Sequence, residues 1–405
     1  MIAPCPTFDP AAVVAALRTL LPATRPLALH EPRFGGREWD YVKDCLDTGW
    51  VSSVGAHVDR FERMLAETCG VARAVAVVNG TAGLHVALLL AGVRPGDEVL
   101  MPALTFVATA NAAAYCGAVP HFADSDPVTL GLDPGALERH LEAIADPGPD
   151  GPVNRATGRR IAALVPVHVF GHPVAMDALN AVAERWRVAV IEDATEALGS
   201  RYHGRPAGSL ARLAVLSFNG NKIITTGGGG ALLTDDPALA DAARHLTTTA
   251  KRPHPWAFEH DRIAYNYRLP NLNAALGCAQ LEQLDGFVAA KRRLARHYRH
   301  HLSALPGLEV VTEPPGCVSN YWLNALKVPD ARARDALLTL SHAEGLLTRP
   351  AWQPMHTLPM YAQCPRAPLP ETEDLTARLV CLPSGPGLMV STEHGPVKGE
   401  QSPCI

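Results

Sequence analysis

The sequence predicts an α/β protein whose mainly parallel β-sheet is covered by helices on both faces. Short apolar runs alternate along the chain with segments of helical periodicity. The runs are apolar at almost every position, as expected for strands that are buried on both sides. Strands and helices that alternate in this way are typical of parallel sheets with crossover helices.

The predicted elements follow one another in a regular order from residue 72 to residue 200. Strands are expected at 72–80, 97–106, 118–126, 162–171 and 188–200, with helices at 81–93, 108–117 and 176–187. The carboxyl ends of such strands lie along one edge of the sheet, where the ligands of α/β proteins bind. Because polar residues follow several of these strands, we expect them to meet in a single site.

The 405 residues are enough for two or three domain-sized units. We expect a large domain at 45–275, a smaller C-terminal α/β domain at 276–390, and an N-terminal helical segment at 1–44 that packs with the smaller domain. The polar stretch at 145–160 predicts an exposed excursion. Residues 268–305 predict a long helix that is bent or interrupted, and 391–405 predict a disordered tail.

Composition and charge exclude several classes of function. The net charge of −4 gives no electrostatic reason to expect a nucleic-acid or membrane partner. No apolar run is long enough to span a bilayer. The nine cysteines include no CxxC pair, which disfavours structural zinc and thioredoxin-like chemistry and predicts reduced thiols in the cytoplasm.

Asp193 ends the apolar run VAVIEDATEALGS at 188–200. A carboxylate at the end of such a buried strand needs a partner that stabilises its charge. A cationic ring nitrogen of a ligand would be one such partner. The alternative is that Asp193 caps the N-terminus of a helix.

The motif NGT at 79–81 leads into a predicted helix and offers free backbone N–H groups and a hydroxyl, which suit a phosphate. Ser217 could add a second hydroxyl from another strand end. Phe106 follows the strand at 97–106, where its ring could stack on a flat ligand or pack as an ordinary core residue.

Lys222 lies in LSFNGNKIITTGGGG at 216–230, ahead of four glycines. A phosphate-binding P-loop needs its lysine after the last glycine and directly before Ser or Thr, so this stretch is not a nucleotide loop. The glycines instead permit a tight hairpin that would hold the lysine in place. An amine held at a strand end can form an imine with a carbonyl, whereas the alternative is a solvated surface lysine.

A phosphate cradle, a stacking aromatic ring, a buried aspartate and a strand-end lysine are together the components of a pyridoxal phosphate site. In such a site the aspartate keeps the pyridine nitrogen protonated. The lysine holds the cofactor as an imine and moves a proton to and from the substrate.

The chain resembles the DegT/DnrJ/EryC1/StrS sugar aminotransferases, which have the fold type I pyridoxal phosphate-dependent transferase fold. The matching segments are NGTAGLHVAL, PALTFVATAN, VPVHVFGHP, IEDATEALGS, LSFNGNKIITTGGGG, YNYRLPNLNAALG and RPAWQPMHTLPMY. The resemblance extends over nearly the whole chain. It implies a large domain with a mainly parallel mixed sheet and a smaller C-terminal α/β domain.

The resemblance also implies a role for individual residues. Lys222 would bind the cofactor, and Asp193 would bind its ring nitrogen. The remaining cofactor-binding residues would be Gly80, Thr81, Ala82, Phe106, Glu196 and Ser217, together with Asn266, which would reach into the site of the neighbouring subunit. A site shared in this way implies a homodimer.

Two positions depart from the family pattern. Many members have Gln or His in place of Glu196, and many have Glu in place of Gly228. IEDATEALGS and SFNGNKIITTGGGG resemble a subgroup that acts on UDP-linked 4-keto-6-deoxy-N-acetylhexoses, on routes to bacillosamine or legionaminic-type sugars. The implied reaction is amino transfer from L-glutamate to a nucleotide-linked 4-ketosugar.

Two alternatives on the same fold are a pyridoxamine phosphate-dependent sugar dehydratase and a non-catalytic regulator. The dehydrating branch has histidine in place of the lysine, and a regulator would be expected to lose the Lys222–Asp193 pair. His168 and His356 are further candidates for contact with the sugar. His168 and His172 have a spacing that suits a metal only on a helix, and VHVFGHP predicts a strand end, so no metal is expected.

Overall fold

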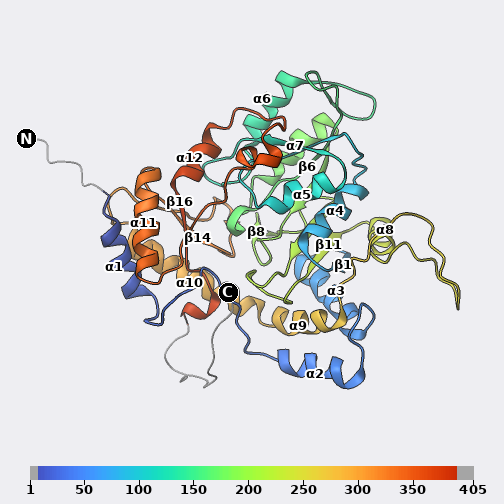
Figure 1. Cartoon of the computed structure of the whole chain (residues 1–405), viewed down its shortest axis with the longest axis horizontal. Coiled ribbons are helices and arrows are strands. Elements are labelled where there is room, and N and C mark those ends of the chain that lie inside the picture. Colours follow the sequence, from blue (N-terminus) through green and yellow to red (C-terminus); the bar gives the residue numbers. More distant parts are fainter. Residues whose placement is uncertain (1–7, 390–405) are drawn as a thin grey trace, which may run out of the picture.

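The computed structural model describes residues 8–389, so the tail expected at 391–405 lies outside the described residues (Figure 1). A seven-stranded sheet forms the centre of the larger part of the chain. Its strand order is β1 (Arg73–Val77), β11 (Gly230–Thr234), β10 (Leu213–Ser217), β7 (Ala189–Asp193), β6 (Ile161–Leu164), β2 (Glu98–Pro102), β3 (Val119–Ala123). β11 runs antiparallel to both of its neighbours, and the other pairs are parallel.

Helices cover both faces of this sheet, as Figure 1 shows. One face packs against α4 (Gly80–Leu90), α5 (Val107–Tyr115) and α8 (Pro237–Thr247), and the other against α3 (Ala56–Cys69), α6 (Pro134–Ile144), α7 (Met176–Trp186) and α9 (Asn271–Leu281). Successive residues of β10 alternate between the two sides: Val215 packs in one core cluster, and Ala214 and Leu216 pack in the other. The predicted α/β fold with a mainly parallel mixed sheet is confirmed.

Several strands are shorter than the sequence predicts. The strand expected at 162–171 ends at Leu164, because Pro166 has no N–H to donate and the chain then turns through a short 3-10 helix, Val169–Gly171. The predicted excursion at 145–160 contains a small antiparallel ribbon, in which β4 (Ala145–Asp146) pairs with β5 (Val153–Asn154).

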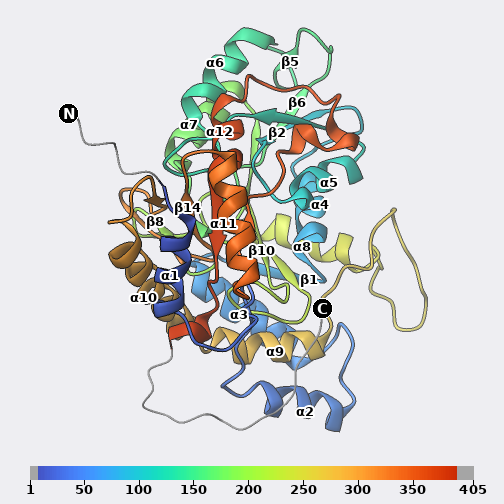
Figure 2. The same ribbon diagram turned by 60° about the vertical axis from the view of Figure 1, so that its left-hand side comes forward.

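A second, antiparallel sheet lies in the C-terminal part of the chain. Its strand order is β12 (Glu309–Val310), β14 (Asn324–Lys327), β16 (Leu379–Leu382), β15 (Arg349–Pro350). It packs in one core cluster with α1 (Pro10–Leu20), α11 (Ala331–Ala343) and the second half of α10 (Leu284–Leu302), which lie near one another in Figure 2. α12 (Pro370–Arg378) precedes β16.

The long helical pattern at 268–305 is interrupted at residues 282–283, where α9 ends and α10 begins. α9 packs against α3 and against α2 (Glu38–Thr48), in the core of the larger part. α10 joins the two parts, because Leu284 and Phe287 lie in that core while Leu294 and Tyr298 lie in the core of the smaller part. No helix within residues 8–389 is long and apolar enough to cross a membrane.

Candidate active site

A cavity of about 340 Å³ lies at the carboxyl ends of β7 and β10, between the N-termini of α4 and α5 and two tryptophans of the C-terminal part. It is lined by Gly80, Thr81, Phe106, Thr109, Asp193, Thr195, Glu196, Ser217, Lys222, Trp322 and Trp352, among others. Residues that are far apart in the sequence therefore meet at the strand ends, as the sequence predicts. We call this cavity the catalytic pocket.

Lys222 lies in the loop between β10 and β11 and is only 9% exposed. Its Nζ lies 3.2 Å from Oε1 of Glu196 and 3.8 Å from the centre of the Trp322 ring. The loop is closed by two backbone hydrogen bonds at Phe218, whose N–H donates to Gly229 O and whose carbonyl accepts from Thr226 N. The lysine is thus held inside the catalytic pocket and is not a solvated surface residue.

Asp193 is buried at the end of β7, and both of its carboxylate oxygens have partners. Oδ2 accepts a hydrogen bond of 2.8 Å from the Thr109 hydroxyl, and Oδ1 accepts one of 3.2 Å from Thr195 N. Since β7 is followed by turns and then by β8 (Arg201–Tyr202), Asp193 does not cap a helix. The structure therefore excludes the alternative interpretation of this residue.

Glu196 is also buried, and it joins the lysine to the rest of the pocket. Its Oε2 accepts a hydrogen bond of 2.9 Å from Phe170 N, and its Oε1 accepts one from Lys222. Burial raises the pKa of Glu196 above its ordinary value, while the nearby Lys222 amine opposes that rise. The site thus places a lysine amine beside a carboxyl group that can hold a proton.

Side chains from two other strand ends approach the N-terminus of α4 closely. A Cβ on Gly80 would lie 3.0 Å from Ser217 Cβ and 3.2 Å from Thr195 Cγ2, so only glycine fits without displacing them. Asn79 caps the helix by accepting a hydrogen bond of 2.8 Å from Ala82 N. The N–H groups of Gly80 and Thr81, at the first two positions of the helix, have no acceptor within it.

Ala82, which the resemblance implies as a cofactor-binding residue, does not lie at the pocket. Its N–H is taken by the Asn79 side chain, and the residue does not line the catalytic pocket. Gly80, Thr81 and Ser217 do line it. The available donors at this end of the pocket are the first two N–H groups of α4 and the Ser217 hydroxyl.

Aromatic residues form the outer wall of the pocket. Phe106 is 51% exposed, and its ring centre lies 6.2 Å from that of Trp352. The Trp322 and Trp352 rings are nearly parallel, with centres 6.4 Å apart. Sequence reasoning missed both tryptophans and Thr109, because no spacing in the sequence distinguishes them from ordinary core residues.

The structure does not bring the two candidate histidines to the pocket. His168 is completely buried: its Nε2 lies 2.8 Å from Glu192 Oε1, and its Nδ1 accepts a hydrogen bond from Val174 N. His356 lies with Nε2 3.5 Å from Glu373 Oε1 and does not line the pocket. Contact of either ring with a substrate in this pocket is therefore not supported. Asn266 lies outside the pocket of its own chain.

Comparison with known proteins places these residues in a family. The family model of the DegT/DnrJ/EryC1/StrS aminotransferases matches residues 32–394. EpsN of Bacillus subtilis (strain 168), whose name describes it as a pyridoxal phosphate-dependent aminotransferase, is 38% identical over 373 residues, which are 91% of this chain and 93% of EpsN.

Two further proteins have names that concern sugars. The GDP-perosamine synthase of Caulobacter vibrioides is 38% identical over 360 residues, 88% of this chain and 90% of that protein. The crystal structure of DesI in the presence of its TDP-sugar product has a TM-score of 0.79 and 34% identity, and the match covers 92% of this chain and 91% of that one. The chain therefore belongs to the DegT/DnrJ/EryC1/StrS aminotransferase family and is a pyridoxal phosphate-dependent sugar aminotransferase.

Proposed function

We propose that the enzyme transfers the amino group of L-glutamate to the C4 carbon of a nucleotide-linked 4-keto-6-deoxy sugar. The observation that carries this proposal is the position of the Lys222 amine, 3.2 Å from Glu196 and in the same cavity as Asp193. A lysine in this position favours amino transfer over the dehydrating reaction, in which histidine is expected.

The catalytic pocket fits pyridoxal phosphate. Asp193, fixed by Thr109 and Thr195, would hold the protonated ring nitrogen. The Gly80 and Thr81 N–H groups and the Ser217 hydroxyl would hold the phosphate, in a cradle that a side chain at Gly80 would fill. Phe106 would stack on the ring. When bound, the cofactor supplies an electron sink for the charge that develops on the substrate carbon.

Lys222 is the group of this chain that can bind the cofactor covalently and move a proton at the substrate carbon. Glu196 accepts a hydrogen bond from its amine and so fixes the direction in which the side chain points. The Trp322 ring covers the amine on one side, and Trp352 lines the same pocket, so both rings would limit the access of water to the reacting groups.

The choice of nucleotide for the substrate rests on the sequence resemblance and on the named relatives. The sequence resemblance favours UDP, whereas a relative of 38% identity is named as a synthase of GDP-perosamine. We therefore propose that the substrate is a sugar linked to a nucleoside diphosphate. Sugars linked to GDP, UDP and dTDP are to be tested side by side. Since nucleotide sugars are cytoplasmic metabolites, we also place the reaction in the cytoplasm.

The enzyme is proposed to act as a homodimer in which Asn266 completes the partner's site. Asn266 follows an arm, residues 252–263, whose large apolar side chains are exposed: Trp256 is 81%, Phe258 80% and Ile263 91% exposed in the single chain. Exposed apolar groups of this size mark an interaction surface. Mixing Asn266→Ala with Lys222→Met dimers should restore part of the activity that each lacks, and no recovery on mixing would contradict a shared site.

The substrate proposal is tested with a panel of 4-keto-6-deoxy sugars linked to GDP, UDP and dTDP, each incubated with L-glutamate. Mass spectrometry should find an amino sugar nucleotide and an equal amount of 2-oxoglutarate with one of them. A product that has lost water and gained no nitrogen would indicate the dehydratase alternative. Amino transfer to a free sugar but to none of the three nucleotides would overturn the proposed substrate class.

A further inference from the structure

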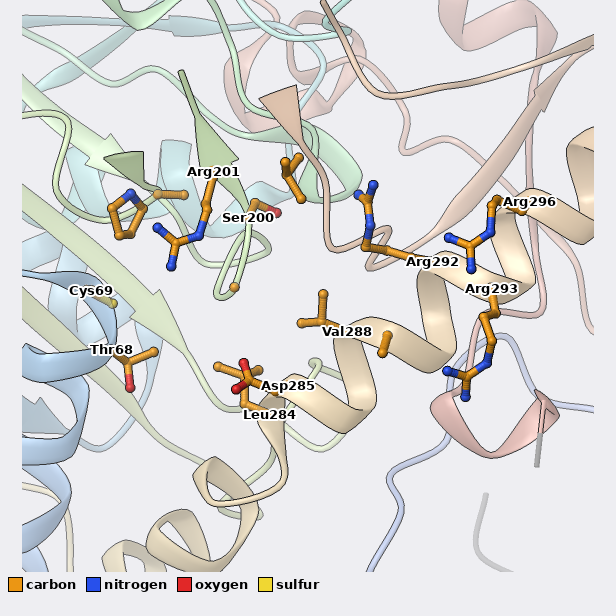
Figure 3. Close-up of a pocket in the computed structure, with 15 residues that line it drawn as sticks. Thr68, Cys69, Ser200, Arg201, Leu284, Asp285, Val288, Arg292, Arg293 and Arg296 are labelled. Carbon is orange, nitrogen blue, oxygen red and sulfur yellow. The ribbon is translucent and has the colours of Figure 1, made fainter. Parts of the chain in front are cut away.

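A second cavity, of about 440 Å³, lies outside the catalytic pocket and is lined by several arginines. Its walls are α10 from Leu284 to Arg296, the start of β8, the C-terminal end of α3, and Val318 of β13 (Cys317–Val318). Figure 3 shows Arg292, Arg293 and Arg296 along α10, with Arg201 across the cavity from the helix. We call this cavity the arginine cleft.

The charge of the arginine cleft is only partly balanced. Arg292 forms a two-pronged ion pair with Glu313, with distances of 2.5 and 3.0 Å. Within residues 8–389, Arg201, Arg293 and Arg296 pair with no carboxylate. Asp285 is the acidic residue that lines the cleft. The cleft thus has a net positive charge in a chain whose overall charge is −4.

The position of the arginines on α10 is not explained by the stability of the helix. Basic residues favour the last turn of a helix, where they balance its dipole, and Arg299, His300 and His301 already lie there. Arg293 and Arg296, the two arginines of α10 in the cleft that have no carboxylate partner within residues 8–389, are three residues apart and so are neighbours on the helix surface, where like charges repel each other. A bound anion would turn this repulsion into a favourable interaction.

The cleft is built separately from the catalytic pocket, although one loop contributes to both. Asp193, Thr195 and Glu196 line the catalytic pocket, and Gly199, Ser200 and Arg201 line the cleft. Gly199 has φ +85° and lies so close to α10 that a Cβ would meet Val288 Cγ2 at 2.8 Å. In Figures 1 and 2, α10 and the arm at 252–263 lie on opposite sides of the molecule, so the cleft is also away from the proposed dimer surface.

We propose that the arginine cleft is a second ligand site, which binds a small molecule bearing a phosphate or diphosphate group. Arg293 and Arg296 would bind the phosphate oxygens, since the guanidinium group matches that geometry with paired hydrogen bonds. The apolar side chains of Leu284, Val288 and Val318 would contact the rest of the molecule. The volume of the cleft is that of an ordinary small-molecule site.

The test is isothermal titration calorimetry of the enzyme saturated with cofactor, so that the phosphate cradle of the catalytic pocket is filled. Inorganic pyrophosphate is the first probe. We expect the double variant Arg293→Gln/Arg296→Gln to bind pyrophosphate at least about tenfold more weakly, because two charge-assisted contacts are lost. Glucose 1-phosphate and a nucleoside diphosphate, titrated next, show whether a sugar phosphate or a nucleotide is the tighter ligand.

Two single substitutions test the site without removing an arginine. Ala289 lines the cleft on the exposed side of α10, four residues before Arg293. Ala289→Glu should abolish pyrophosphate binding by occupying the arginines, and it should not destabilise the helix, because Glu and Arg pair favourably at this spacing. Ala289→Gln is its uncharged control and should bind as the wild type does.

Arg299→Gln is the control for the loss of a positive charge from α10, because Arg299 lies on the same helix but does not line the cleft. Arg299→Gln should leave the affinity for pyrophosphate within about twofold of the wild type. The proposal is overturned if the wild type does not bind pyrophosphate at millimolar concentration, or if the double variant and Ala289→Glu bind it as tightly as the wild type does. Equal loss of binding in Arg299→Gln would also overturn it.

Discussion

Two buried lysines contact Trp322, one at its ring and one at its backbone carbonyl, and they differ in what surrounds them. Lys222 lies beside the face of the Trp322 ring, next to Glu196, and lines the catalytic pocket. Lys291, on α10, is completely buried and donates hydrogen bonds to the carbonyl oxygens of Trp322 and Ser384. Burial lowers the pKa of Lys291 well below its ordinary value, and within residues 8–389 it has no carboxylate partner.

We expect that a lowered pKa alone does not make the Lys291 amine reactive. A lysine that attacks a carbonyl needs space for that carbonyl and a group that directs the amine towards it. Lys222 has both, whereas the Lys291 amine is enclosed by backbone carbonyls and lines neither of the cavities described above. Matched substitutions at the two positions therefore test which features of the site carry the chemistry.

Lys222→Met should have the largest effect. We expect the rate of amino transfer to fall by roughly 10⁴-fold or more, because the group that moves the proton is removed. The visible absorbance of the covalently bound cofactor should disappear at the same time. Steady-state assays and an absorption spectrum measure both, and full activity in this variant would show that another amine acts.

Asp193→Asn should have the next largest effect. The amide oxygen can still accept the hydrogen bond from Thr195 N, and the amide nitrogen can donate to the Thr109 hydroxyl, so the fold should be preserved. The amide lacks the negative charge that keeps a ring nitrogen protonated. We expect kcat to fall by about 10²- to 10³-fold, with thermal stability little changed. Normal turnover by this variant would contradict the pairing of Asp193 with the cofactor ring.

Glu196→Gln should change activity by about tenfold or less, because the amide oxygen can still accept the hydrogen bond from Phe170 N while the amide nitrogen can donate to the Lys222 amine when that amine is neutral. Its clearer effect should be on the pH dependence of stability. Since burial raises the pKa of Glu196, the folded chain keeps a proton that the unfolded chain loses just above the ordinary carboxyl pKa. The contribution of Glu196 to the free energy of unfolding is therefore lost as the pH rises through its raised pKa.

Urea unfolding at a series of pH values measures this effect. Glu196→Gln should lack the decline in unfolding free energy that the wild type shows over that range. An identical pH dependence in the two proteins would mean that Glu196 titrates at its ordinary pKa, and that burial does not decide its ionisation.

Lys291→Met should have the smallest effect on activity, within about threefold of the wild type, because the side chain does not line the catalytic pocket. Whereas Glu196→Gln should remove a decline in the free energy of unfolding with rising pH, Lys291→Met should remove an increase. The unfolded chain binds a proton that the folded chain does not, between the lowered pKa and the ordinary lysine pKa, so stability rises with pH there. Urea unfolding should show that Lys291→Met lacks this rise; a large loss of kcat would instead place Lys291 in the chemistry.

The fold could be predicted from the sequence because both faces of the large sheet are buried. β1 is apolar at every position after Arg73, and β10 is apolar at every position before Ser217, so both can be recognised from the sequence alone. The ends of the strands were predicted less well, because they depend on local features of the backbone. The early end of β6 before Pro166 is one example.

The site could be predicted where a residue follows a strand and carries distinctive chemistry, as Lys222 and Asp193 do. Thr109 and the two tryptophans could not, because their importance comes from contacts across the fold and between the two parts of the chain. His168 is the converse case, because the sequence places it after a strand and suggests contact with the sugar. In the structure it is buried, and its partner Glu192 lies in the interior of the sheet.

The division between the two domains was placed from sequence near residue 275. We propose to move it into α10, because α9 packs with α2 and α3 in the core of the large domain, whereas Leu294 and Tyr298 of α10 pack in the core of the smaller one. On the same grounds, α1 would go with the smaller domain and α2 with the large one.

The most direct test is to identify the lysine that binds the cofactor. Borohydride reduction of the enzyme with bound cofactor fixes the lysine–cofactor link, and a protease digest followed by mass spectrometry locates it. We expect the added mass on the peptide that contains Lys222, and no added mass on any lysine of Lys222→Met. An adduct on Lys291, or one that persists in Lys222→Met, would contradict the assignment of Lys222 as the reacting amine.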